Sequence, residues 1–446
     1  MTAKDGQHTP PELQQANSSA ESTIFSQHRI LQDESTNYAI IKNHVPRSRE
    51  PPNFVDMSAA WGAVQDEEKL RTPSRQSERQ PIRQRLNHFT WAWFSTTMGT
   101  GSLANVIFQT PYKFRGLITI GKVIYIIDLV LFVCCLAVIL RRFIVVRGSF
   151  RHSFVHYGEA WFVGTFWVSI SLILQGADSY GHYSGCGQWL ETTMKICFWI
   201  YCGFTLLFAI FQYDLLFVTQ KIDFEGMTPA WILPMYPLIV AGPLAGVILE
   251  HQGPEAGIPI FVAGVTYQGL GWMVTVFLYA IWVIRLFSAD LPVPSLRPGM
   301  YVAVGPTAYT AVGLIMHSER ATSILPDNFL GVETISAPEV LRAVGSIGGI
   351  FLWLLAFWYC ALTTISVLNG VKTMVFTLTW WGFVFPNAGL ALATTAVGRV
   401  LDSPGIKWVS CAMTAILFVL WLFVSIAHIR AVWKGQILWE GKDEDA

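Results

Sequence analysis

The feature that most constrains this chain is a succession of ten long apolar segments after about residue 85. Each holds roughly 20 residues or more, and a helix of that length crosses a hydrocarbon core about 30 Å thick. Because lipid offers no partner for a free backbone N–H or C=O group, each segment is predicted to be a helix. The ten predicted spans are Phe89–Gln109, Ile118–Leu140, His156–Gly176, Thr192–Thr219, Pro229–Glu250, Ile258–Phe287, Pro298–Ser318, Arg342–Asn369, Val375–Gly398 and Ile406–His428.

Composition agrees with a lipid environment. Only 13% of the residues are charged, whereas a soluble chain carries about a quarter. Lys+Arg and Asp+Glu both number 30, so no net charge attracts nucleic acid. Of the 7 cysteines only Cys186 lies in a predicted loop, which argues against a disulfide framework. The sequence therefore indicates an all-α polytopic membrane protein, a class that typically moves a small solute across a bilayer.

Three regions are predicted along the chain. Residues 1–85 are rich in Gln, Ser, Pro, Glu and Arg and carry few apolar residues, so we expect a disordered tail. Residues 86–429 hold the ten spans, and residues 430–446 form a short C-terminal tail. The N-terminus lacks the basic and apolar pattern of a cleaved signal peptide, so the first span is expected to stay in the mature protein.

The loops predict the orientation of the chain. With an even number of spans both termini lie on one side, and that side receives most of the basic residues, including Arg141, Arg142, Arg147 and Arg151 after the second span. The opposite loops hold fewer basic residues. The positive-inside rule therefore predicts that both termini are cytoplasmic.

Proline and glycine are concentrated in the odd-numbered spans. The fifth span contains Pro229, Pro234, Pro237 and Pro243, whereas the second, fourth, eighth and tenth contain no internal proline. Proline frees a carbonyl group and bends a helix, which membranes tolerate where the freed backbone faces protein or water. We therefore predict five helical hairpins with the odd spans inside, around a central pore. The alternative is that proline is simply commoner in membrane helices.

Three stretches of the sequence resemble the tellurite-resistance/dicarboxylate transporter family. They are RLNHFTWAWFSTTMGTG (Arg85–Gly101), FQTPYKFRGLITIGKVIYIID (Phe108–Asp128) and FTLTWWGFVFPNAGLAL (Phe376–Leu392). The resemblance implies a ten-helix pore, a homotrimer with one pore per protomer, and small anionic substrates. In channel members of the family a phenylalanine upstream of the Trp-Trp and Phe-Pro pattern plugs the pore. By that match the gate here is Phe376, with Phe383 and Phe385 as further candidates.

Within the family, the loop Pro111–Gly121 and the stretch HFTWAW look most like fungal malic acid carriers. The resemblance implies a C4-dicarboxylate transporter in the plasma membrane that moves malate by proton symport. Sulfite efflux pumps share the Met-Gly-x-Gly pattern found at Met98–Gly101, so a sulfite pump is one alternative. An anion channel of the same fold is the other.

Cationic residues near the pore mouths are the first candidate substrate ligands. A charge at the centre of a bilayer costs about 2.5–3.5 kcal/mol, so charged ligands are expected near the ends of the spans. Arg115 follows the first span and Arg320 follows the seventh. Arginine can bind a carboxylate through two parallel hydrogen bonds. The alternative is that these arginines meet lipid headgroups or pair with nearby glutamates.

Polar residues within the inner spans are the second set of candidates. Thr100, Ser102 and Asn105 surround two glycines of the first span, where hydroxyl and amide groups could bind an oxyanion. In the seventh span Thr310 and His317 are seven residues apart and share one stripe of the helix. The alternative for the small residues is close helix packing.

Three carboxylates fall within the predicted spans, namely Asp128, Glu159 and Asp214. Intramembrane carboxylates are functional candidates, proton relays included. We expect these three to pair with basic residues near the helix ends or to cap helices, with proton transfer as the alternative. Protonation of the substrate could itself couple transport to protons.

Enzyme motifs are not found in the sequence. The pattern Gly99-x-Gly101-x-x-Ala104 imitates a dinucleotide fingerprint, but it lies inside a predicted helix with no strand before it. No His/Cys cluster has zinc-ligand spacing, and no nucleophile elbow or phosphate-binding loop is present. The sequence therefore predicts no enzyme activity, no cofactor and no metal site.

Overall fold

The computed structural model describes residues 81–219, 226–331 and 333–439, and all of its regular structure in these ranges is helical. The predicted spans of even number are single long helices. These are α5 (Leu117–Val145), α9 (Gln188–Thr219), α11 (Pro254–Ser288), α13 (Ala337–Leu368) and α15 (Pro404–Lys434). The prediction of helices in place of strands is confirmed. Residues 1–80 of the predicted tail (residues 1–85) lie outside the described residues, and the tail's last four residues form a short helix, α3 (Ile82–Arg85).

The predicted spans of odd number are broken near their N-terminal ends. Each begins with a short 3-10 or α-helical segment and continues as an α-helix after a break. The pairs are η2 (Trp91–Trp93) with α4 (Phe94–Gln109), α7 (Tyr157–Ala160) with α8 (Val163–Tyr183), η4 (Pro229–Met235) with α10 (Tyr236–Ile248), η6 (Pro294–Ala303) with α12 (Val304–Ile324), and η9 (Leu378–Phe383) with α14 (Phe385–Val400).

Proline accounts for part of this pattern. Pro234 lies inside η4, Pro298 inside η6, and Pro386 in the first turn of α14, where the missing N–H and the fixed φ interrupt an α-helical ladder. The break between α7 and α8 contains no proline. Close packing is the visible feature there, because a Cβ on Gly164 would overlap the carbonyl group of Leu233 in η4.

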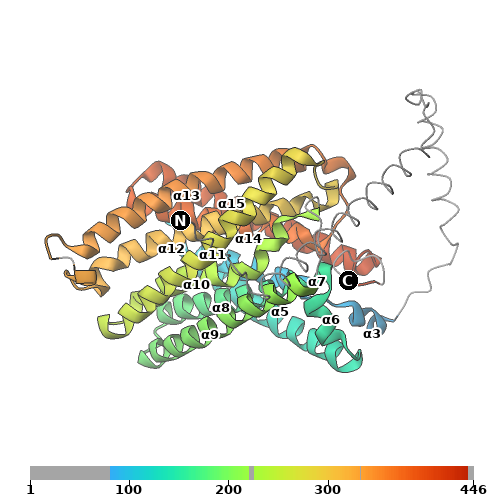
Figure 1. The fold of residues 1–446 in the computed structure, drawn as a ribbon, viewed down its shortest axis with the longest axis horizontal. Helices are drawn as coiled ribbons and strands as arrows, with labels where there is room; N and C mark the ends of the chain where they lie inside the picture. Colours follow the sequence, from blue (N-terminus) through green and yellow to red (C-terminus); the bar gives the residue numbers. More distant parts are fainter. Residues whose placement is uncertain (1–80, 220–225, 332, 440–446) are drawn as a thin grey trace, which may run out of the picture. The chain divides into compact units, whose positions relative to one another are not determined.

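The odd spans lie inside the bundle and the even spans lie outside. The most apolar part of the η4–α10 span is 100% buried and that of the η6–α12 span 83% buried, whereas the five even spans reach only 22–33%. The two short helices α4 and α14 are also buried along almost all of their length. Figure 1 shows outer and inner helices side by side, as in the pair α12 and α13. The predicted inside position of the odd spans is confirmed.

The predicted count of ten spanning helices is supported only in part. Within the described residues 8 helical spans are long and apolar enough to cross a membrane. The other two predicted spans correspond to α4 and α14, which have 16 residues each. The predicted spans are longer than these α-helices because they also include the preceding 3-10 segments η2 and η9. The arrangement in five hairpins remains a prediction.

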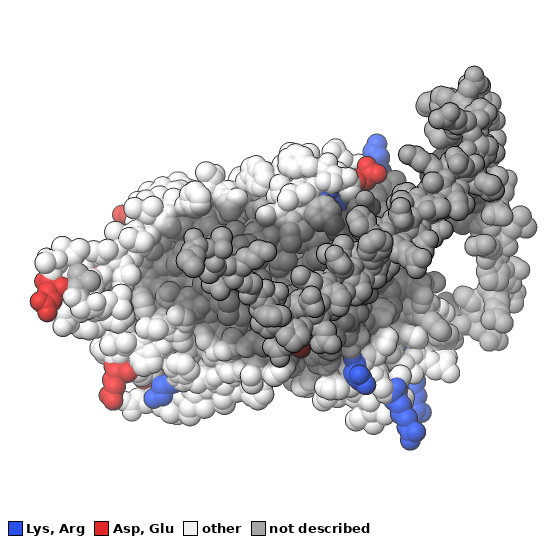
Figure 2. Space-filling model, in the orientation of Figure 1, with Lys and Arg blue, Asp and Glu red and all other residues white. Residues whose placement is uncertain are grey.

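The two ends of the described region meet at one end of the bundle. Arg85, at the end of α3 (Ile82–Arg85), donates hydrogen bonds to the carbonyl groups of Val432 at 2.6 Å and Leu438 at 3.2 Å. The red end of the described chain and α3 lie at the same end of the bundle in Figure 1. Figure 2 shows the described charged residues gathered at the two ends of the helices, with largely uncharged flanks between them. This pattern is typical of a lipid-facing surface.

A buried ion pair joins the second and third spans. Arg142 of α5 donates two hydrogen bonds to the carboxylate of Glu159 in α7, one of them at 3.0 Å, and a third to the carbonyl group of Phe89 at 2.9 Å. Both side chains are less than a tenth exposed. The expectation that Glu159 pairs with a basic residue near a helix end is confirmed.

This ion pair leads to a stability prediction. Replacing Arg142 by methionine leaves a buried carboxylate without its partner, which typically costs about 3–5 kcal/mol. We expect R142M to unfold at a clearly lower temperature than wild type in a thermal melt of the detergent-solubilised protein. The double variant R142M/E159Q removes both charges and should recover part of the loss. Equal melting temperatures for the single and double variants would contradict this account.

Candidate functional site

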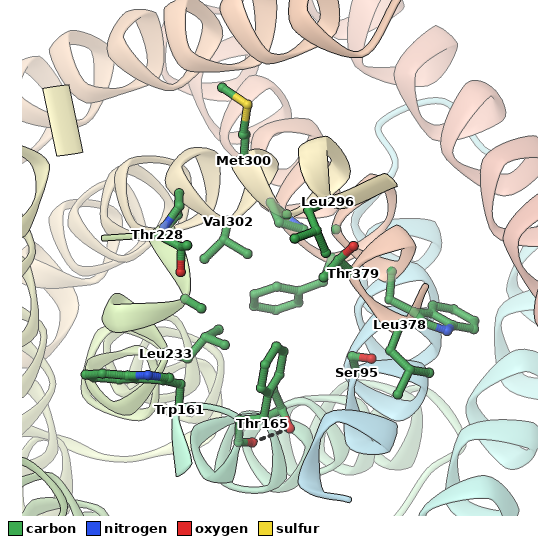
Figure 3. Close-up of a pocket in the computed structure, with 18 of the residues that line it drawn as sticks. Ser95, Trp161, Thr165, Thr228, Leu233, Leu296, Met300, Val302, Leu378 and Thr379 are labelled. Atoms are coloured by element: carbon green, nitrogen blue, oxygen red, sulfur yellow. Dashed lines mark hydrogen bonds between the residues drawn. The ribbon is translucent and has the colours of Figure 1, made fainter. Parts of the chain in front are cut away.

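Two cavities lie at opposite ends of the five broken spans. The first, here called the N-side cavity, has a volume of about 200 Å³ and lies at the N-terminal ends of α4, α8, α10, α12 and α14. Figure 3 shows Thr228, Leu233 and Val302 on one side of its opening and Ser95, Leu378 and Thr379 on another. Every broken span contributes lining residues, so the helix breaks themselves create this cavity.

The walls of the N-side cavity are apolar with a few hydroxyl groups. Its polar side chains include Ser95, Thr165, Thr228 and Thr379. The hydroxyl of Ser95 donates to the carbonyl group of Ala92 at 2.6 Å. No Lys, Arg, Asp or Glu is among the described residues that line the cavity. Any attraction for an anion must therefore come from hydroxyl groups, from the indole N–H of Trp161, which is unpartnered within the described chain, and from the helix N-termini at this cavity.

Phe385 closes the inner end of the N-side cavity. This side chain is 1% exposed and its ring stacks on Tyr309 with centroids 4.9 Å apart. On another side it contacts Tyr236, with centroids 5.6 Å apart. The hydroxyl of Tyr236 donates to the carbonyl group of Val302. Three aromatic rings from α10, α12 and α14 thus fill the space between the inner helices.

The second cavity, here called the C-side cavity, lies at the C-terminal ends of the same inner helices. Its volume is about 580 Å³, and charged residues contribute much of its lining. These are Lys113, Asp178, Glu250, Glu319, Arg320 and Arg399.

Two ion pairs hold the arginines of the C-side cavity. Arg320 lies 2.8 Å from a carboxylate oxygen of Glu250, and Arg399 lies 3.1 Å from one of Glu319. Arg399 also donates to the side-chain oxygen of Gln109 at 3.2 Å. About a third of each arginine side chain remains exposed, at 32% and 35%. Pairs of this kind are weak, so both guanidinium groups can exchange partners with a solute.

Lys113 adds a third cation at the mouth of the C-side cavity. Its ammonium group lies 5.0 Å from the centre of the Phe108 ring, a distance typical of a cation–π contact. Although the residue as a whole is exposed, partial burial lowers the pKa of Lys113 from its usual value. The lowered pKa reflects desolvation of the charged form.

A densely packed layer separates the two cavities. Tyr236 lines one and Val247 lines the other, and their separation of eleven positions on α10 corresponds to about 16 Å of helix. The described linings have no residue in common. The conformation is therefore closed between its two ends, with Phe385 at the border of this layer.

The two predicted arginines occupy different places. Arg320 lines the C-side cavity, as expected for a cation near a pore mouth. Arg115 is exposed on the loop between α4 and α5 and lines neither cavity. Arg399, which was not among the predicted ligands, is the second arginine of the C-side cavity. Its position directly after the ninth predicted span, like that of Arg320 after the seventh, was the signal that could have identified it.

The three predicted polar residues of α4 are buried between the cavities. Thr100 accepts a hydrogen bond from Trp421 of α15 at 3.1 Å, which turns it toward an outer helix. Ser102 donates to the carbonyl group of Gly99 at 2.7 Å. Asn105 donates to the carbonyl group of Leu172 in α8 at 3.2 Å. None of them lines a cavity in this conformation, and their roles as ligands remain a prediction.

Thr310 and His317 of α12 are also buried away from the cavities. The hydroxyl of Thr310 has no hydrogen-bond partner in the described chain. Nδ1 of His317 lies 2.8 Å from the carbonyl oxygen of Gly313. Gly264 of α11 makes room for this imidazole, since a Cβ there would lie 2.5 Å from Nε2. His317 therefore faces an outer helix.

Phe376, the gate implied by the family match, lies in the segment between η8 (Val371–Thr373) and η9. Its ring contacts Trp380 at 5.4 Å and His428 at 5.5 Å between centroids. It is 8% exposed and lines neither cavity. Of the three phenylalanines considered from the sequence, Phe385 is the one at the closed layer.

The carboxylates within the predicted spans differ in burial and in their partners. Asp128 of α5 is fully buried, and neither of its oxygens has a hydrogen-bond partner in the described chain. It points toward α4, where a Cβ on Gly101 would lie 2.6 Å from Oδ2. The expectation that Asp128 pairs with a basic residue is therefore wrong. Asp214 of α9 is exposed on an outer helix.

Two water-accessible cavities on the axis of five buried, broken helices define a polytopic membrane protein of the carrier and channel class. Residues 88–429 match the SLAC1 family, described as "Voltage-dependent anion channel", and the chain belongs to this family. The resemblance inferred from the sequence is confirmed. Membership in a family of transporters and channels also agrees with the prediction that the chain is not an enzyme.

Sequence similarity to two named transport proteins extends over most of the chain. A malic acid transport protein from Schizosaccharomyces pombe is 33% identical over 369 residues, which are 82% of this chain and 83% of that protein. A sulfite efflux pump from Arthroderma benhamiae is 23% identical over 342 residues, or 76% of this chain and 89% of the pump. The chain is thus similar to transport proteins for two kinds of anion.

Proposed function

We propose that this protein is a secondary transporter for C4-dicarboxylates such as malate, located in the plasma membrane. The observation that carries the proposal is the pair of cavities at opposite ends of the same five helices, one of them lined by arginines. Alternating exposure of a site between two such cavities is how secondary carriers work. The similarity to a malic acid transport protein supports the choice of substrate.

Anion selectivity follows from the direction of the inner helices. α4, α8, α10, α12 and α14 all begin at or next to the N-side cavity. A helix N-terminus carries a partial positive charge and free N–H groups, which favour a bound anion. Broken helices in transporters use such termini to hold carboxylate groups. The N-side cavity can therefore attract an anion without a fixed charge that would trap it.

The C-side cavity suits a dicarboxylate in size and charge. Its volume of about 580 Å³ falls within the roughly 300–1,000 Å³ of small-molecule sites. Arg320 and Arg399 can each bind one carboxylate with two parallel hydrogen bonds. Glu250 and Glu319 pair with these arginines when no substrate is bound. Because they compete with the substrate for the guanidinium groups, they lower the affinity of the cavity for the substrate, and the substrate can leave.

The arrangement in the membrane is part of the proposal. η2 and α4 together span about 30 Å when 3-10 and α-helical rises are added, which matches a hydrocarbon core. On this basis α4 and α14 complete ten spanning helices in five hairpins. Both termini are cytoplasmic, and the N-side cavity opens to the cytoplasm. The family resemblance supports a homotrimer with one pathway in each protomer.

Flux measurements with purified protein in proteoliposomes test this proposal. We expect radiolabelled malate to enter the vesicles at a rate well above that of protein-free vesicles, and a proton gradient to raise that rate. Absence of malate flux together with robust sulfite flux would replace the proposal by a sulfite efflux pump, which the similarity to such pumps makes the second candidate. Large unitary currents would instead identify an anion channel.

Arg399 gives a specific prediction about the substrate. A charge-assisted hydrogen bond contributes about 1.5–3 kcal/mol, so R399Q should raise the KM for malate about tenfold or more. R115Q, which changes an exposed arginine outside both cavities, is the matched control and should shift KM by less than about twofold. Initial uptake rates over a range of malate concentrations measure both variants. A larger effect of R115Q would contradict the assignment of the C-side cavity.

A further inference from the structure

A cluster of two histidines and one aspartate lies in the wall of the C-side cavity. Asp178 and His182 occupy successive turns near the end of α8, and His251 ends η5 (Leu249–His251). Oδ2 of Asp178 lies 3.3 Å from Nδ1 of His251, and Oδ1 lies 3.6 Å from Nε2 of His182. The two imidazole rings stack with centroids 3.5 Å apart. All three residues line the cavity.

Two buried polar atoms of this cluster have no hydrogen-bond partner in the described chain. The Asp178 side chain is 1% exposed, yet its Oδ1 has no hydrogen-bond partner in the described chain, and neither has Nε2 of His182. A buried carboxylate oxygen without a partner costs free energy. A ligand that accepts electron pairs from both atoms would remove that cost.

The ligand atoms are spaced for one metal ion. The three residues each offer an atom within 4.8 Å of the others. Tetrahedral ligands at zinc distances lie about 3.3 Å apart, and the two Asp–His distances, each to a different oxygen of Asp178, are 3.3 and 3.6 Å. The two rings are stacked in this conformation, so metal binding requires them to rotate about χ2 until their lone pairs point at a common ion. Three protein ligands leave a fourth position, as in zinc sites that keep an open position, and all three residues belong to the cavity lining.

We propose that Asp178, His182 and His251 bind a divalent transition-metal ion such as Zn²⁺ in the wall of the C-side cavity, with the fourth position open to water or to an anionic solute. Imidazole nitrogen selects this class of ion over Mg²⁺ and Ca²⁺, which prefer oxygen ligands. This is the one group of three potential ligands found in the described residues. The sequence did not indicate it, because His251 is 73 positions from Asp178.

The ion would lie on the same cavity wall as the arginines. Arg320 pairs with Glu250, the neighbour of His251. A cation in the cluster would add positive charge beside the proposed dicarboxylate ligands, and its open position could accept a carboxylate oxygen. Metal binding itself does not depend on the proposed transport function, so the two can fail separately.

Metal titration of the full-length protein tests the inference. The protein is purified without a histidine tag and titrated with Zn²⁺ in a calorimeter, and with Co²⁺ while visible absorption is recorded. We expect wild type to bind Zn²⁺ and to give the intense d–d absorption of four-coordinate Co²⁺. D178N keeps the shape of the side chain but supplies a poor ligand, and it should weaken binding about a hundredfold and remove the Co²⁺ absorption. H251A should do the same.

The control variant is H152A. His152 stacks on His156 with centroids 4.8 Å apart, so it matches the stacked pair of the cluster but has no place in it. H152A should bind both ions as wild type does, and size-exclusion chromatography of all variants verifies that each is folded. Zn²⁺ affinity and Co²⁺ absorption in D178N equal to those of wild type would overturn the proposal. Failure of wild type to bind Zn²⁺ would overturn it as well.

Discussion

Replacing Phe385 by alanine is expected to raise basal anion flux about tenfold or more. The ring of Phe385 fills the layer between the two cavities and stacks on Tyr309 at 4.9 Å. Removing it opens space between α10, α12 and α14, where its ring contacts Tyr236 and Tyr309. A barrier lowered by only about 1.4 kcal/mol corresponds to a tenfold faster rate. Tracer flux without a proton gradient, and current across a planar bilayer, measure the effect.

Two controls accompany this variant. Truncating a buried phenylalanine typically costs about 3–5 kcal/mol, so F385L, which keeps most of the volume, shows whether loss of folding is involved. F385L should retain a low basal flux. F376A tests the gate implied by the family match, and here it should leave basal flux close to wild type, because Phe376 packs against Trp380 outside both cavities. A rise in flux with F376A and none with F385A would contradict our assignment.

The membrane fold could be predicted from the sequence because it depends on local properties. A long run of apolar residues leaves a helix as the only way to satisfy the backbone in lipid, and proline in alternate spans indicated which helices are inside. What hydropathy could not locate is where each inner helix breaks. The break between α7 and α8 contains no proline. The feature seen at this break is the close contact of Gly164 with Leu233, which is a tertiary contact.

The candidate site was less predictable, because it too depends on tertiary contacts. Arg320 was identified because it directly follows an apolar span. Thr100 and His317 also have suitable chemistry, but rotation of their helices points them at Trp421 and Gly264 of outer helices. Asp178 and His251 come together only because α8 and α10 pack side by side. Side-chain direction and helix pairing depend on packing, which a single sequence does not specify.

Asp128 is proposed to carry the proton in proton-coupled transport. An ionised aspartate in the centre of a membrane helix costs about 2.5–3.5 kcal/mol, and among the described residues Asp128 has neither an ion-pair partner nor a hydrogen-bond donor to offset this cost. It contacts α4 at Gly101, so a change in its charge acts directly on an inner helix. Movement of α4 and protonation of Asp128 would then be coupled.

Replacing Asp128 by asparagine imitates the protonated acid permanently and is expected to uncouple transport from protons. A gradient of about one pH unit supplies about 1.36 kcal/mol per proton, which is a tenfold accumulation. Wild type should therefore accumulate malate about tenfold more than D128N in proteoliposomes with this gradient, while exchange at equal pH continues in both. D214N, which changes an exposed carboxylate on α9, should behave as wild type. Full accumulation by D128N would contradict the proposal and assign the coupling to protonation of the substrate itself.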